Sequence, residues 1–87
     1  MSDIYVVMGR TGEYSDRSEW GVVAFKNEEA AKQHVEKATH RAKELEATKP
    51  SQWEDLQAHL KKNEFDPNME LDYTGTSYYY MAVELRP

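Results

Sequence analysis

The 87-residue sequence contains no cysteine, which excludes disulfide bonds and thiolate zinc sites and fits a reducing compartment. It also lacks any apolar run approaching the ~18 residues of a membrane span, and it has no basic-then-apolar leader. We therefore expect a cytoplasmic protein with no membrane partner. Basic residues are few as well: eleven Lys and Arg against sixteen Asp and Glu give a net charge of -5. Nucleic-acid binders usually carry a basic patch, so the composition predicts protein partners and no direct contact with nucleic acid.

Signatures of catalysis or of cofactor binding are also missing. The glycine-containing stretch 8–21 has neither the lysine nor the following helix of a phosphate-binding loop. His34 and His40 are six residues apart, which does not place them on one helical face, so the sequence predicts no metal site. No serine lies in a strained elbow and no carboxylate pair stands out. We expect no catalytic residue, no cofactor and no enzymatic activity.

Apolar patterning predicts strands and helices along the whole chain. Residues 3–8 and 20–25 are rich in β-branched and aromatic side chains and form the predicted strands of an antiparallel hairpin. Asn27 is the expected cap of a long helix, in which apolar residues recur with spacings of four and three. That stripe consists of Ala31, Val35, Ala38, Ala42 and Leu45.

The second half of the chain predicts a shorter helix and a final strand. The helix is expected over about 52–62, and the strand over 78–85. Between them, Met69–Thr74 alternates apolar and polar residues, which fits either an edge strand or an extended loop.

The order of these elements, β-β-α-α-β-β, predicts a single α+β domain spanning 1–87. We expect a small, mainly antiparallel sheet of three or four strands with two helices on one face. The first strand is the most apolar, so it is expected at the centre with the second and last strands on either side.

Two polar regions are candidate contact sites for a partner protein. The hairpin tip is either a simple polar turn or a contact loop, because loops on rigid hairpins often carry binding residues. Acids before the last strand add a negative rim, which could face a basic surface or serve only solubility. The residues expected at the partner-binding site are Arg10, Tyr14, Asp16, Arg17, Glu64, Asp66, Glu70 and Asp72.

Tyrosines on the strands suggest a further surface. If the helices cover one face of the sheet, the other is left open, and an open aromatic face usually meets another molecule. Tyr5, Tyr78 and Tyr80 are the expected residues of a homodimer at that face. Alternatively, a long loop or the segment Met69–Thr74 folds over it.

The opening "IYVVMGRTGEYSDRSEWGVVAFKNEEAAKQHVE" and the closing "YYYMAVEL" resemble small uncharacterised proteins of phages and prophages. In those proteins a hairpin with a "G-x-Y-S-D"-like tip precedes an "E-E-A-A"-type helix and a final strand. The resemblance covers the first half of the chain and its last ten residues, and it implies an accessory protein of the bacterial host cytoplasm.

Proteins of that kind often bind and block a host protein, anti-CRISPR and other anti-defence inhibitors among them. The leading hypothesis is therefore a non-enzymatic inhibitor of a host defence or nucleic-acid-handling protein. The alternatives are a self-associating structural or accessory protein and, third, a small enzyme or ligand-binding domain with the hairpin loop as a lid.

Overall fold

Three strands and two helices make up the computed structural model, which describes residues 3–12, 17–71 and 75–86, without the side chains of residues 53 and 54. In chain order the elements are β1 (Asp3–Thr11), β2 (Ser18–Phe25), α1 (Glu28–Ala47), α2 (Trp53–Leu60) and β3 (Thr76–Glu84). The α+β class and the antiparallel sheet are confirmed. Both hairpin strands reach further toward the tip than the apolar runs alone predicted.

The sheet has the strand order β2-β1-β3, with β1 antiparallel to both neighbours, so the central placement of the first strand is confirmed. The β1–β3 register runs without a shift from Asp3–Glu84 to Thr11–Thr76. The β1–β2 register shifts between Val7 and Met8, because Val22 is an extra residue in β2. Such a bulge reverses the side-chain alternation along the bulged strand.

The bulge explains how β2 points its largest side chains toward α1. Trp20 lies against Gly9, Val22 packs on the core, and the ring of Phe25 lies 5.5 Å from the ring of His34 in α1. Strict alternation would have placed Trp20 and Phe25 on opposite faces of the sheet.

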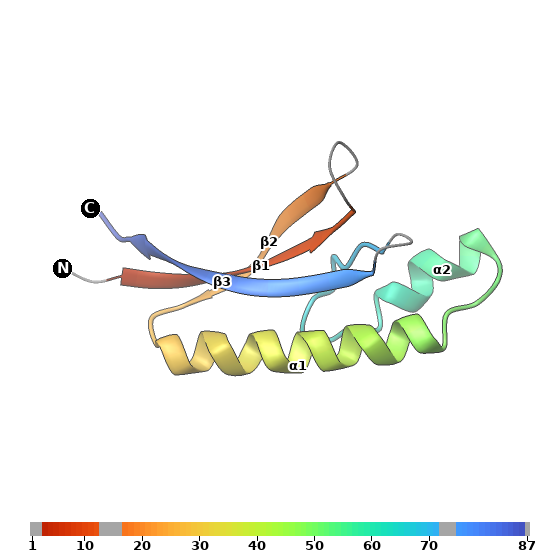
Figure 1. Ribbon diagram of the computed structural model, residues 1–87, viewed down its shortest axis with the longest axis horizontal. Coiled ribbons are helices and arrows are strands. Elements are labelled where there is room, and N and C mark those ends of the chain that lie inside the picture. Colours follow the sequence, from red (N-terminus) through yellow and green to blue (C-terminus); the bar gives the residue numbers. More distant parts are fainter. Residues whose placement is uncertain (1–2, 13–16, 72–74, 87) are drawn as a thin grey trace.

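Helix α1 begins as the sequence predicts and lies along one side of the sheet (Figure 1). The Asn27 side chain accepts a hydrogen bond from the backbone N–H of Ala30 at 3.1 Å, and Glu28 and Glu29 occupy the first turn. The predicted stripe faces inward: its three alanines and Leu45 are buried, and Val35 packs at the edge of the core. Small alanine side chains allow the helix to approach the strands closely.

The two helices cover the sheet unequally. Helix α2 (Trp53–Leu60) packs beside the end of α1, and its last residue, Leu60, lies in the core together with Tyr78 of β3 (Figure 1). Length accounts for this. The 20 residues of α1 span ~30 Å, which matches the ~30 Å of the nine-residue strands, so α1 alone covers the sheet lengthwise.

The predicted order also changes before β3, because no strand lies between α2 and β3 in the described residues. Residues 69–71 are not in a strand, and the rest of the alternating segment, 72–74, lies outside the described residues. The observed order is β-β-α-α-β. Backbone bonds from Asp66 N to Asn63 O and from Met69 N to Asp66 O, each 3.1 Å, hold this part of the chain in turns.

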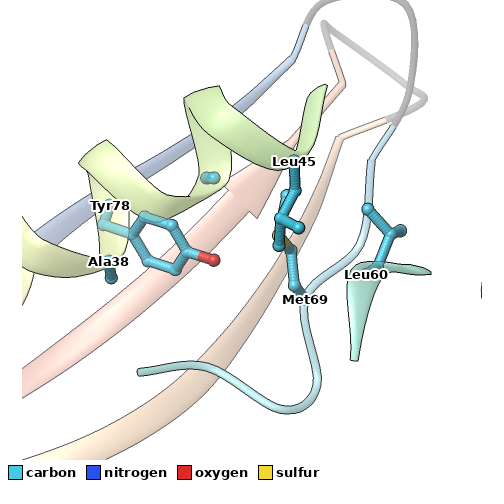
Figure 2. Packing of buried hydrophobic residues seen from close by; sticks show 6 residues of the cluster. Ala38, Leu45, Leu60, Met69 and Tyr78 are labelled. Carbon is cyan, nitrogen blue, oxygen red and sulfur yellow. The ribbon is translucent and has the colours of Figure 1, made fainter. Parts of the chain in front are cut away.

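The core lies where α1, the end of α2, the 61–71 segment and β3 meet (Figure 2). Its buried side chains are Ala38, Ala42, Leu45, Leu60, Met69 and Tyr78. All of it is on one side of the sheet, which leaves the opposite side without a packed layer among the described residues.

Candidate interaction surface

Burial distinguishes the two faces of the sheet. Val7 is completely buried, Gly9 lies under the indole of Trp20, and Tyr78 is in the core, so these positions face α1. Side chains alternate along a strand, and their neighbours therefore point to the opposite side. No described element lies over that side.

We define the open face as positions 4, 6 and 8 of β1 together with the residues of β2 and β3 that the strand registers pair with them. In register, Ile4 pairs with Val83, Val6 with Met81, and Met8 with Tyr79. From β2, Gly21 lies opposite Met8 and Ala24 opposite Val6. The open face thus comprises Ile4, Val6, Met8, Gly21, Ala24, Tyr79, Met81 and Val83. Met81 is 42% exposed and Val83 39%, so large apolar side chains reach solvent here.

The open face ends in polar residues at the hairpin side. Arg10 donates from Nε to Ser77 Oγ at 3.3 Å, and its guanidinium carbon lies 5.5 Å from the centre of the Tyr79 ring. Glu19 is opposite Arg10 in register and pairs with Arg17, Nε to Oε1, at 3.6 Å. Such exposed pairs stabilise little, so this end is a polar rim beside the apolar patch.

The tyrosines expected at the open face lie on the other side of the sheet, so that expectation is wrong. Tyr5 and Tyr80 are half-buried, with ring centres 6.4 Å apart in an edge-on contact, and Tyr78 is only 8% exposed. The sequence predicts an open side of the sheet, but on β3 the residues that point to it are Tyr79, Met81 and Val83, which alternate with the expected Tyr78 and Tyr80. A tyrosine fills the core here because its hydroxyl has a buried partner, which alternation alone cannot reveal.

That partner is Asp66, which is completely buried. Its Oδ2 accepts from the Tyr78 hydroxyl at 2.7 Å and from Trp20 Nε1 at 2.9 Å, while Oδ1 accepts from the backbone N–H of Asn68 at 3.2 Å. Burial, together with the bond to the Asp66 carboxylate and its negative charge, raises the pKa of Tyr78 far above the ordinary tyrosine value. Asp66 has no exposed surface, so the expectation that it contacts a partner is wrong.

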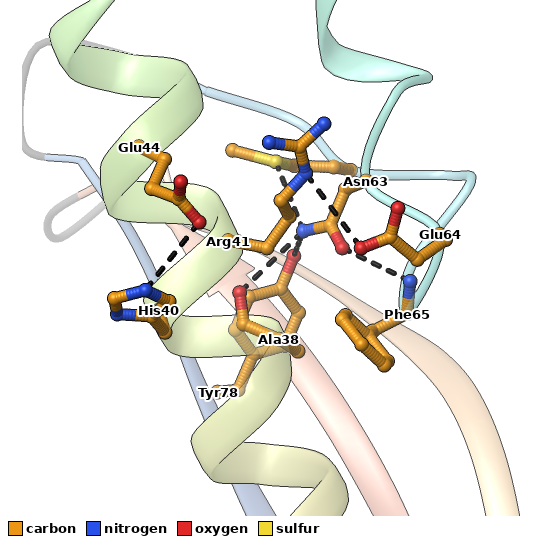
Figure 3. Close-up of polar contacts among 9 residues, drawn as sticks. Ala38, His40, Arg41, Glu44, Asn63, Glu64, Phe65 and Tyr78 are labelled. Atoms are coloured by element: carbon orange, nitrogen blue, oxygen red, sulfur yellow. Dashed lines mark hydrogen bonds and ion pairs between the residues drawn. The ribbon is translucent and has the colours of Figure 1, made fainter.

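Asn63 extends the buried polar cluster toward α1 (Figure 3). Its Nδ2 lies 3.5 Å from Ala38 O and from the Tyr78 hydroxyl, and its Oδ1 accepts from the backbone N–H of Phe65 at 3.1 Å. Buried polar groups that satisfy one another fix one arrangement of the chain. We conclude that this cluster anchors the 61–71 segment under the sheet.

The other expected contact residues divide between two places. Glu70 Oε1 accepts from Ser18 Oγ at 3.3 Å, which brings Glu70 to the hairpin end of β2, where Ser18 pairs with the buried Thr11. Glu64 instead lies 3.7 Å from Nε of Arg41 on α1. The remaining three, Tyr14, Asp16 and Asp72, lie outside the described residues.

The histidines pack against the backbone or lie exposed. His34 Nε2 is 2.7 Å from Phe65 O, with its ring between those of Phe25 and Phe65. His59 Nε2 is 2.8 Å from Leu45 O, while His40 is exposed. Within the described parts of the chain, no three His, Asp or Glu side chains are grouped to hold a metal ion.

A hollow lies beside α2. It opens widely to solvent, and its mixed lining consists of Thr48, Pro50, Asp55, Ala58, His59 and Lys62. It lacks the enclosure and convergent polar groups that small-molecule sites usually have.

Across the described ranges, neither helix has the length and apolar character that crossing a bilayer requires. No protein-family model, curated protein or solved structure matches the chain.

Proposed function

We propose that this chain is a non-enzymatic binding protein that acts by protein–protein contact, and that the open face is its contact surface. One observation carries the proposal: three neighbouring strands present uncharged side chains to solvent together, with Met81 and Val83 well exposed.

The pattern differs from that of an ordinary solvated sheet. An antiparallel sheet with one face in water normally alternates apolar and polar residues. Here β1 presents Ile4, Val6 and Met8 outward while its inward positions include the buried Val7. Apolar side chains on both faces of the central strand are typical of a sheet that is covered on both sides. Methionine and tyrosine are also common at protein interfaces because they adapt to a partner or combine apolar area with a hydroxyl.

The polar groups of the core support binding rather than catalysis. Asp66, Tyr78 and Asn63 are buried and contact one another, so their hydrogen-bonding capacity is used in the fold. A catalytic acid or base has to reach a substrate, and these side chains do not.

The test is a pull-down with a charge placed on the open face. Tagged wild-type chain is mixed with untagged chain and bacterial lysate, beside a Met81→Lys/Val83→Lys variant and a Gln33→Lys control on the exposed side of α1. Circular dichroism verifies that all three are folded. We expect the face variant to lose the proteins that wild type and control retain. Equal retention by all three would overturn the proposal.

A second candidate function uses the hairpin end, and the grouping there favours it. Arg10, Arg17 and Glu19 lie together at the hairpin end of the sheet, where they form a charged rim. We propose that this rim contacts a host defence or nucleic-acid-handling protein, as a phage-type inhibitor would. The resemblance to phage accessory proteins and the net charge of -5 support that choice of partner.

The two candidates separate in one experiment. If the hairpin end makes the contact, a Tyr14→Ala/Arg17→Ala variant should lose the captured host complex. The Met81→Lys/Val83→Lys variant should still retain that complex. Loss only in the face variant assigns binding to the open face and contradicts the second candidate.

A further inference from the structure

We infer that the open face binds the open face of a second copy of this chain. This inference rests on the proposed function and names the partner of that surface. Three properties carry it: the amount of exposed surface, the absence of charge across the face, and the distribution of large and small side chains over its strands.

The chain exposes more surface than a monomer of its mass should. Its accessible area is 6031 Å², whereas a folded monomer of 10.1 kDa is expected to expose about 5,300 Å². The excess is roughly 700 Å² over the chain as a whole, and each partner in a stable protein interface buries ~800 Å². The radius of gyration, 13.9 Å, likewise exceeds the ~12 Å expected for this length.

The layers of the fold explain the excess. The extents of 48 × 27 × 18 Å describe a slab in which one long helix covers one side of a sheet. A second copy placed face to face would give four layers, helix–sheet–sheet–helix, with both sheets covered on both sides.

The open face can match itself without repulsion. A two-fold interface brings the same patch of each copy together, so a charge near the axis would meet its like. At Ile4, Val6 and Met8 of β1, and at the positions of β2 and β3 paired with them, every residue on this side is uncharged, while Arg10 and Glu19 lie beyond them at the hairpin end. The contact thus places apolar side chains on apolar side chains and leaves the charges at the rim.

Side-chain size indicates how the copies are oriented. On this face β2 carries the small Gly21 and Ala24, whereas β3 carries the large Tyr79 and Met81. A two-fold axis parallel to the strands places β3 of each copy over β2 of the other, so large side chains meet small ones. Val6, in the middle of the central strand, then lies close to the axis.

The first test is sedimentation velocity of the full chain from low-micromolar to submillimolar concentration. Wild type and the Gln33→Lys control should sediment with twice the mass of the 10.1 kDa chain. Met81→Lys/Val83→Lys should weaken the dimer by roughly 100-fold or more, because each copy would bring two unpaired charges into an apolar contact. Val83→Thr, which keeps a β-branched side chain, should weaken it by about 10-fold.

A second test uses the absence of native cysteine. Facing sheets lie ~10 Å apart, too far for a direct disulfide, so a short bis-maleimide is the appropriate probe. Val6→Cys should give a covalent dimer, and Gln33→Cys, on the exposed side of α1, should not. The reverse result would overturn the inference.

The outcomes distinguish this inference from the proposed function. A wild-type chain that stays monomeric throughout overturns the dimer, and the proposed function survives only if Met81→Lys/Val83→Lys loses a captured protein. A dimer that neither face variant weakens also overturns the inference, since another surface would then make the contact.

Discussion

Replacing Asp66 by alanine should be among the most destabilising single changes in this chain. Asp66 is 0% exposed and accepts hydrogen bonds from Tyr78, Trp20 and the backbone of Asn68. Alanine removes every one of these acceptors and leaves the donors in place. The loss therefore falls on groups that folding has already taken out of water.

The magnitude follows from how deeply each donor is buried. A buried donor left without a partner costs ~1–3 kcal/mol. Tyr78 is buried and should cost about 2 kcal/mol, while Trp20 and the Asn68 N–H are nearer solvent and should add about 1 kcal/mol together. The expected total, about 3 kcal/mol, is a large part of the ~4–13 kcal/mol that a domain of this length has.

Urea denaturation followed by circular dichroism measures this loss. Asp66→Asn should cost only about 1 kcal/mol, because an amide oxygen at the Oδ2 position still accepts from Trp20 and Tyr78. Asp55→Ala is the matched control, since Asp55 is exposed, and it should change stability by less than about 0.5 kcal/mol. If Asp66→Ala were no more destabilising than Asp55→Ala, the anchoring role of the buried cluster would be refuted.

Three further predictions concern stability. Gly9→Ala should destabilise by about 1–3 kcal/mol in the same denaturation assay, because a Cβ at Gly9 would lie 2.6–2.8 Å from Trp20 ring atoms; an unchanged midpoint would contradict the close packing. Asn27→Ala should cost about 1 kcal/mol by removing the cap on Ala30, whereas a loss below about 0.2 kcal/mol would show that the cap is dispensable. Folding raises the pKa of Tyr78, so the hydroxyl should contribute its full stabilisation of the fold below pH ~10. Above that pH the free energy of unfolding should fall by up to ~1.4 kcal/mol per pH unit. A pH series should show that extra slope in wild type and not in Tyr78→Phe; identical slopes would refute the burial of this hydroxyl.

Local patterns predicted the elements that depend on local physics. The four-and-three spacing from Ala31 to Leu45 placed the inner side of α1, and Asn27 placed its start. The β-branched and aromatic run at 3–8 predicted the central strand correctly. Each of these features depends on residues close together in sequence.

The parts that failed depend on contacts between distant segments. Alternation shows that β3 has two faces, but which face meets α1 is decided by the pairing of Tyr78 with Asp66, twelve residues away. The bulge at Val22 likewise arises only when β2 pairs with β1. Asp66 was assigned to the surface by its charge, although the turn at 66–68, in which Asp66 accepts from Asn68, gave a local hint of a structural role.

The same limit applies to the candidate surface. An uncovered side of the sheet followed from the expectation that both helices lie on one face. Its residues did not, because Ile4, Val6 and Met8 are as apolar as the core and alternation alone does not show which set is buried. Met81 and Val83 became candidates only when the register placed them beside that set.

The most direct test of the central claim, that the open face makes the protein–protein contact, is methyl NMR of the four methionines. Met8 and Met81 lie on the open face, whereas Met69 is buried in the core and serves as an internal reference. Single Met→Leu substitutions assign the methyl signals of the labelled wild type. Dilution should shift the Met8 and Met81 signals and expose these methyl groups to a soluble paramagnetic probe. The Met69 signal should stay unchanged. If the exposure of Met8 and Met81 to the probe changed neither with protein concentration nor on addition of a captured partner, the open face would not be the contact surface.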